Sequence, residues 1–168
     1  MKMKHLIITL VAVIGFAFNG NAQAKLGHVN TQELLVKLPE YKAAQTKAET
    51  FGNELKASLD NMTMEYQKKL GDLQKKEPTM TNTEKETAIA DLQQLEQRIQ
   101  NFQVSAQERM QKQENELLAP IIDKVSSAIK KVGEENGFTY IFDMSTGATV
   151  YQNGTDVTPL VKKELGLQ

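Results

Sequence analysis

The feature that most constrains the fold is a pair of long segments of nearly equal length, 40–76 and 83–118, each carrying a single apolar stripe. In both segments apolar or small residues recur three or four positions apart, which is the period of an α-helix. A short loop, 77–82, separates them and contains Pro78. This arrangement predicts an antiparallel helical hairpin whose arms, at 1.5 Å per residue, would extend about 55 Å. One narrow stripe per helix is typical of a coiled-coil seam rather than of a globular core.

The seam of the hairpin is expected to consist of the larger apolar side chains in the two stripes. We define the seam as Phe51, Leu55, Met62, Tyr66, Leu92, Leu95, Ile99 and Phe102. Thr83 and Glu86 have the spacing of a capping box, so the second helix is expected to begin there. Pro120 is expected to interrupt the helical pattern, because proline is poorly tolerated inside helices.

The remaining mature segments, 25–39 and 119–168, are expected to form a small body at the base of the arms. The first segment predicts a strand, and then a helical turn for which Asn30 and Glu33 have the spacing of a capping box. The second predicts a continued helix that stops at Asn136-Gly137, a β-hairpin and a final helix. The hairpin strands are expected at 138–143 and 148–152, joined through Ser145-Thr146-Gly147, and the final helix from Thr158-Pro159 to Gly166.

These elements predict an α+β fold that is mostly α, with a long antiparallel coiled-coil hairpin on a small β-containing body. The body has only about 65 residues, and chains of that size bury a limited core. Its few strands also leave sheet edges open unless another copy covers them. We therefore expect the body to associate with further copies of the chain.

Residues 1–24 have the features of a secretory signal peptide: a basic start, an apolar run and small residues before the cleavage site. Cleavage is expected between Ala24 and Lys25, which would deliver the mature chain to the periplasm. The apolar run of about 13 residues is too short for a membrane anchor, because a bilayer requires about 20. Without Lys2 and Lys4, the chain's 20 Lys and Arg fall to 18 against 21 Asp and Glu, a net charge of −3. Such a balance disfavours a general nucleic-acid binder.

The chain lacks the residues that most enzymes and metal sites need. It has no Cys, and His28 is the only histidine of the mature sequence. Asp123, Asp143 and Asp156 are expected at a helix, a strand end and a turn, where acidic residues commonly cap or solvate. No nucleotide-binding, serine-hydrolase or zinc-protease motif is present. We therefore expect no catalytic residue, no cofactor and no metal, and we interpret His28 as structural.

The order of leader, opening strand KLGHVN, long charged and Gln-rich hairpin, and ending GFTYIFDMSTGATVYQNGTDVTPLVKKEL resembles the Skp/OmpH family of periplasmic chaperones for outer-membrane proteins. The stretch LLAPIIDKV is similar to members from Bacteroidetes-type bacteria. The resemblance implies a trimer whose three arms enclose a cavity that holds unfolded membrane proteins without ATP. One departure is charge, because the best-known members are basic whereas segment 40–118 carries 11 Lys/Arg and 14 Asp/Glu. Binding of lipopolysaccharide, anionic lipid or DNA is therefore not carried over.

The function expected is that of an ATP-independent holdase that binds unfolded outer-membrane proteins between its arms. Apolar residues outside the seam are the candidate client contacts, namely Met64, Met80, Ile89 and Val104. The alternative is a periplasmic coiled-coil spacer or scaffold that binds no client. Contact of the arm tips with a membrane is less favoured, because their lysines alternate with acidic residues.

Overall fold

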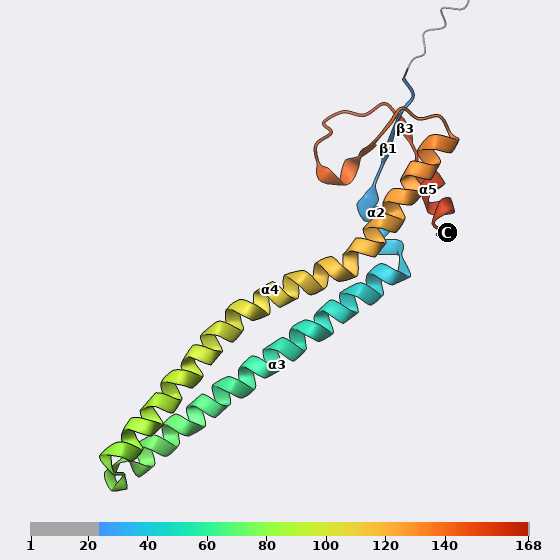
Figure 1. The fold of residues 1–168 in the computed structure, drawn as a ribbon. Coiled ribbons are helices and arrows are strands. Elements are labelled where there is room, and N and C mark those ends of the chain that lie inside the picture. Colours follow the sequence, from blue (N-terminus) through green and yellow to red (C-terminus); the bar gives the residue numbers. More distant parts are fainter. Residues whose placement is uncertain (1–23, 168) are drawn as a thin grey trace, which may run out of the picture.

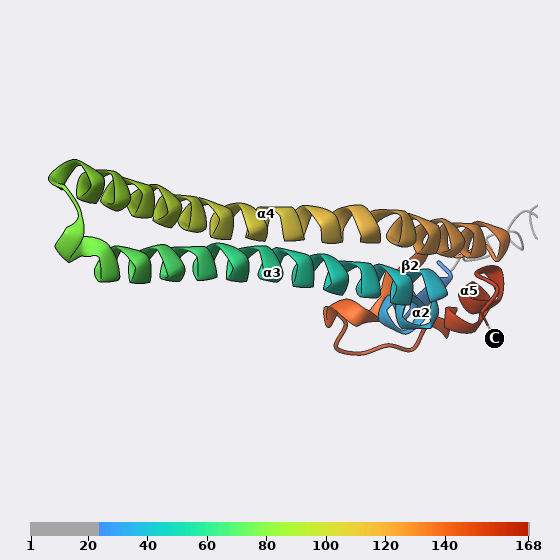
Figure 2. The ribbon, with the colours of Figure 1, turned by 90° about the horizontal axis from the view of Figure 1, so that it is seen from below.

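The computed structural model describes residues 24–167 and consists of a long helical hairpin attached to a small α/β body (Figure 1). Helix α3, Pro39–Lys76, forms one arm, and the first part of helix α4, Asn82–Glu135, forms the other. The two helices lie side by side in both views (Figures 1 and 2). A 3₁₀ helix, η1, Glu77–Thr79, makes the turn at the tip. The predicted signal peptide lies almost wholly outside the described residues.

The predicted start of α4 is wrong by two residues, because a different capping box begins the helix. Thr81 Oγ1 accepts a hydrogen bond from the backbone N–H of Glu84 at 3.3 Å. In return, the backbone N–H of Thr81 donates to the Glu84 carboxylate at 2.8 Å. Thr81 and Glu84 have the same spacing as the predicted pair, Thr83 and Glu86, but lie two residues earlier in the chain. Once the helix has begun at Asn82, Thr83 is already inside it.

The predicted interruption of the helical pattern at Pro120 is also wrong, since α4 runs unbroken from the tip into the body (Figure 1). A proline inside a helix removes one backbone hydrogen bond. Beyond Pro120, α4 buries four apolar side chains in the body core, and this packing holds the helix together across the proline. Those four residues are Ile121, Val125, Ala128 and Val132.

The body contains a three-stranded, all-parallel sheet with the order β2-β1-β3. Strand β1, Leu26–Val29, lies in the centre between β2, Tyr140–Asp143, and β3, Thr155–Asp156. The register pairs Leu26 with Tyr140 and His28 with Phe142 on one side, and His28 with Asp156 on the other.

The predicted antiparallel hairpin of 138–143 and 148–152 is therefore wrong. Both C-terminal strands pair with β1, so they run in the same direction and need a connection that crosses back. A short 3₁₀ helix, η2, Met144–Thr146, and an irregular segment that includes 148–152 provide it. Asp143 fixes the start of this connection, because its carboxylate accepts hydrogen bonds from the backbone N–H groups of Ser145 at 3.0 Å and Thr31 at 3.3 Å.

Helices α2, Thr31–Lys37, and α5, Thr158–Glu164, complete the body and pack with the end of α4 on one face of the sheet. Asn30 caps α2 as its spacing predicted, accepting a hydrogen bond from Glu33 N–H. Gly27 permits close packing, because a Cβ there would lie 3.0 Å from the Phe138 ring. Within residues 24–167, none of the helices has the length and apolar character needed to cross a bilayer. The most completely buried side chains are Val29, Leu34, Leu38, Val157 and Val161.

Candidate binding surfaces

The seam residues lie at buried or half-buried positions along the arms. Leu55 and Leu92 are each 8% exposed and Leu95 is 3% exposed. Phe51, Met62, Tyr66, Ile99 and Phe102 are half-buried. Two contacts between the arms also show their register: the Arg109 guanidinium lies 5.5 Å from the centre of the Phe51 ring, and Lys69 pairs with Asp91 at 3.5 Å. The arms are therefore held together by a thin apolar line with polar contacts beside it.

The four candidate client contacts fall into two groups. Met64, Ile89 and Val104 are 59%, 47% and 63% exposed, which makes them the most exposed large apolar side chains of the paired arm segments. Met80 is half-buried at the tip, where it lines a small cavity of 180 Å³ with Leu73 and Ala88. The four residues do not form one patch. At about 100° per residue, Met64 lies on the side of α3 opposite the seam, whereas Ile89 and Val104 share one side of α4.

A second exposed apolar surface lies on the body and was missed from the sequence. The register of β1 and β2 places Leu26, His28, Tyr140 and Phe142 on one face of the sheet, which we call the open sheet face. Leu26, Tyr140 and Phe142 are 45%, 62% and 50% exposed, and the two aromatic rings stack with centroids 6.2 Å apart. The segment that follows η2 adds Val150 and Tyr151, both almost fully exposed. The sequence Tyr140-Ile141-Phe142 held the available signal. In a strand, successive side chains point to opposite faces, so Ile141 turns inward while Tyr140 and Phe142 turn outward.

A groove of 540 Å³ lies between the open sheet face and the segment 148–154. Its lining is mainly apolar and includes Leu26, Phe142 and Tyr151. The Nδ1 atom of His28 is buried there without a hydrogen-bond partner. Buried polar atoms are normally satisfied in a complete protein surface. The groove is thus an apolar hollow whose wall holds one unsatisfied polar atom.

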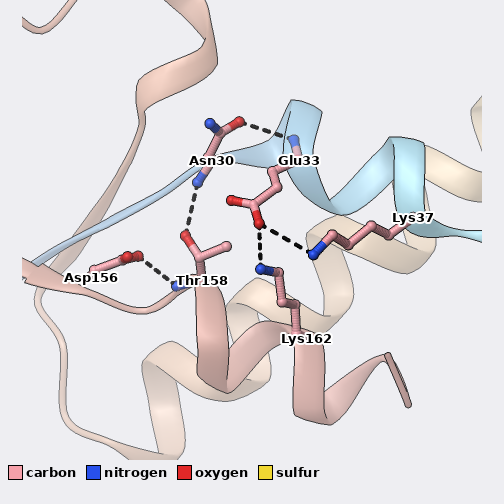
Figure 3. A network of polar contacts seen from close by, with 6 residues as sticks. All are labelled: Asn30, Glu33, Lys37, Asp156, Thr158 and Lys162. Carbon is pink, nitrogen blue, oxygen red and sulfur yellow. Dashed lines mark hydrogen bonds and ion pairs between the residues drawn. The ribbon is translucent and has the colours of Figure 1, made fainter. Parts of the chain in front are cut away.

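A polar network ties the start of the body to its end (Figure 3). Asn30 N–H donates to Thr158 Oγ1 at 3.2 Å, and Thr158 N–H donates to Asp156 Oδ1 at 2.9 Å. The Glu33 carboxylate pairs with Lys162 and, at 3.5 Å, with Lys37. These contacts join α2, near the start of the described residues, to α5, near their end.

The pKa shifts in the body have structural causes. The hydrogen bond from Lys162 holds the pKa of Glu33 below its ordinary value. Partial burial acts to raise the pKa of Asp143, but hydrogen bonds from Thr31 and Ser145 outweigh it and leave the pKa lowered. Both carboxylates are therefore held ionised by groups that fasten one element to another, an arrangement suited to stabilising the fold rather than to exchanging protons.

None of the described residues forms a cluster of three or more His, Cys, Asp or Glu side chains that could hold a metal ion. Among the three aspartates considered from the sequence, Asp143 and Asp156 accept hydrogen bonds from backbone N–H groups, and Asp123 is exposed on α4.

Comparisons with known proteins agree with this arrangement. The chain is 29% identical over 171 residues to the Chaperone protein Skp of Photorhabdus luminescens, covering 97% of this chain and 99% of that protein. The Skp of Photorhabdus laumondii subsp. laumondii matches with the same identity and coverage. The fold of this chain is similar to the crystal structure of an OmpH-like outer membrane chaperone from Caulobacter crescentus CB15. The TM-score is 0.72, with 17% identity, and the match covers 87% of this chain and 86% of that one.

The fold comparison confirms the predicted class, a helical hairpin on a small β-containing body. The relatives are named as chaperones, which are not enzymes, and this confirms the prediction that the chain has no catalytic role. Residues 25–165 match the family described as Outer membrane protein (OmpH-like). The chain belongs to this OmpH-like family, in which its full-length relatives are Skp chaperones.

Proposed function

We propose that this protein is an ATP-independent periplasmic holdase that binds unfolded outer-membrane proteins between its arms and prevents their aggregation. The observation that carries the proposal is the division of the arm surface. A thin seam holds the two helices together, while Met64, Ile89 and Val104 remain exposed and available for contact. A flexible methionine and two aliphatic side chains suit weak, adaptable binding to many sequences. The full-length similarity to Skp chaperones supports the same function.

Delivery to the periplasm follows from the predicted signal peptide, which is cleaved between Ala24 and Lys25. No nucleotide-binding loop of the GxxxxGK[ST] type occurs in the sequence, in keeping with a chaperone that works without ATP. Retention of a client would then depend only on binding equilibrium. A client would be released when it can reach a more stable state, which is its own folded barrel in the membrane.

Association of the body into an oligomer, a trimer by resemblance to the family, is part of this proposal. The open sheet face and its groove support it, because another copy would cover this exposed apolar surface. The outer edge of β2 is also unpaired within the described residues. Assembly through the bodies would place several arms around a common space.

The experiment that tests this function is dilution of a urea-unfolded outer-membrane porin into buffer with and without the protein. A holdase suppresses the rise in light scattering at near-stoichiometric amounts without nucleotide. A coiled-coil spacer, the alternative, leaves the scattering unchanged. A variant in which Met64, Met80, Ile89 and Val104 are all replaced by Ser tests the candidate contacts. It should keep its helicity by circular dichroism and lose part of its protective effect.

A further inference from the structure

The side of α4 that faces away from the seam carries a continuous line of uncharged side chains, which joins Ile89 and Val104 to five glutamines. Successive members are three or four residues apart, so at about 100° per residue they all lie within an arc of about 80° around the helix. We call this line the amide stripe. Its members, all exposed, are Ile89, Gln93, Gln97, Gln100, Val104, Gln107 and Gln111.

The composition of the amide stripe differs from that of the arm around it. Segment 40–118 has 25 charged residues, yet none of the seven positions of the stripe is charged. The stripe contains the two most exposed large apolar residues of α4's arm portion, Ile89 and Val104. Nine consecutive residues around Val104, from 99 to 107, carry no charge on any side of the helix. Glu96 and Glu108 border the stripe without interrupting it.

The amides of the stripe are largely free to bind a partner. Within the described residues, only Gln111 uses its amide in a hydrogen bond with another side chain, donating to Asn115 Oδ1 at 3.2 Å. Several charged groups of the arms, in contrast, have partners. Lys112 pairs with Glu116 at 3.8 Å and Lys69 with Asp91 at 3.5 Å. The stripe therefore offers both donors and acceptors at positions where the helix itself makes no use of them.

The length of the stripe fits one class of partner. From Ile89 to Gln111 the helix rises about 33 Å, at 1.5 Å per residue. An extended chain of about ten residues has the same length at 3.3 Å per residue, and a membrane-spanning β-strand has 9–11 residues. Such a strand in its unfolded state has unpaired backbone N–H and C=O groups and alternating apolar side chains. Glutamine amides can hydrogen bond to the former, and Ile89 and Val104 can contact the latter.

We propose that the amide stripe is a binding track for a single extended, uncharged segment of a client, of the length of one transmembrane β-strand. This inference rests on the holdase function and specifies the contact surface for it. Because backbone groups are common to all sequences, recognition through amides is independent of client sequence. Because the track is neutral, its contribution to binding should change little with ionic strength, since salt screens charges.

Charge substitution on the stripe tests the proposal. The variants are Gln97→Glu, Gln100→Glu and Gln107→Glu together, and the same three positions changed to Lys. Glutamine, glutamate and lysine have similar helix propensities, so the arm should remain folded, which circular dichroism checks. The matched control places the same three charges on exposed glutamines of α3, at Gln45, Gln67 and Gln74. The control has the same net charge as the stripe variant, so the two differ only in where the charge lies.

The readout is fluorescence anisotropy of a labelled, urea-unfolded eight-stranded outer-membrane protein titrated with the chaperone at about 20 and about 500 mM salt. We expect both stripe variants to lose about tenfold in affinity, because a charge must be desolvated and three neutral hydrogen-bonding groups are lost. The affinity of the α3 controls should stay within about twofold of that of the unsubstituted protein. The affinity of the unsubstituted protein itself should change less than about threefold between the two salt concentrations.

Different failures have different meanings. If the unsubstituted protein does not bind the client, the holdase function is wrong and the inference is lost with it. If it binds and the stripe variants match their α3 controls, the function stands and the track is wrong. Opposite effects of Glu and Lys on affinity would also overturn the track, because they would show that attraction between net charges governs binding. Association of the arms of two chaperone molecules through the stripe, seen as a larger particle by light scattering, would assign it to self-assembly instead.

Discussion

Side chains on the arms differ sharply in burial over short distances along the same helix. Leu95 is 3% exposed, whereas Val104, nine residues later, is 63% exposed. Both are aliphatic and both lie in α4, so the difference comes only from the side of the helix on which each is placed. Mutations at the two positions should therefore separate stability from binding.

Replacing Leu95 by Ala should lower the free energy of unfolding by about 2 to 5 kcal/mol, because it leaves a cavity in the seam. The Val104→Ser variant is the control, with an expected change of about 0.5 kcal/mol at an exposed position. Urea unfolding followed by circular dichroism measures both. Equal losses at the two positions would contradict the assignment of the seam.

Asp143 should make stability depend on pH in the acidic range. Its folded-state pKa lies below its ordinary value of 3.8, so its contribution to stability is complete above that value and is lost as the pH falls through the lower folded-state pKa. The Asp143→Asn variant should therefore show a shallower loss of unfolding free energy below about pH 4. Asp123→Asn, on an exposed part of α4, serves as the control and should follow the unsubstituted protein. Identical curves for all three would rule out this role of Asp143.

At the scale of elements, the start of α4 depends on the Thr81 capping box. The Thr81→Ala variant removes the hydrogen bond to Glu84 N–H and should cost about 1 kcal/mol of stability. Thr83→Ala lies inside the helix and should be nearly neutral, since alanine has the higher helix propensity. Thermal unfolding of the two variants gives the comparison. A larger loss at Thr83 than at Thr81 would contradict the observed cap.

The hairpin could be predicted from the sequence because its signals are long and local. Many apolar steps define each arm, and errors in one cap move a boundary by only two residues, as at Thr81 and Thr83. Pro120 misled the prediction because its effect depends on tertiary packing: the body core formed by Ile121 and Val125 keeps the helix continuous. The tendency of proline to break a helix is a local property, and here the packing of distant residues in the body core outweighs it.

The small sheet could not be predicted in the same way, because short strands carry little information about their partners. The segment 148–152 has the composition of a strand, yet β1 pairs with the two-residue segment Thr155–Asp156 instead. The open sheet face was missed for the same reason, since it exists only when Leu26 and Tyr140 are brought side by side. Exposure of Met64, Ile89 and Val104, by contrast, followed from their positions outside the helical stripes.

At the scale of the whole molecule, assembly and client binding are assigned to different ends. The open sheet face lies on the body, while the amide stripe lies on the arm. Replacing Tyr140 and Phe142 by Ser should weaken assembly and lower the mass measured by light scattering at micromolar concentration, because the exposed apolar area available for association is reduced. Val36→Ser, on exposed α2, is the control. An unchanged mass for the double variant would place the assembly surface elsewhere.

The most direct measurement of the central claim is sedimentation velocity of the mature protein mixed with a urea-unfolded outer-membrane porin diluted into nucleotide-free buffer. The account predicts a soluble particle that contains an oligomer of this chain and the client together, with little aggregated porin. If the porin is instead pelleted as aggregate while this protein sediments alone at its own rate, the chain does not hold unfolded clients and the account is contradicted.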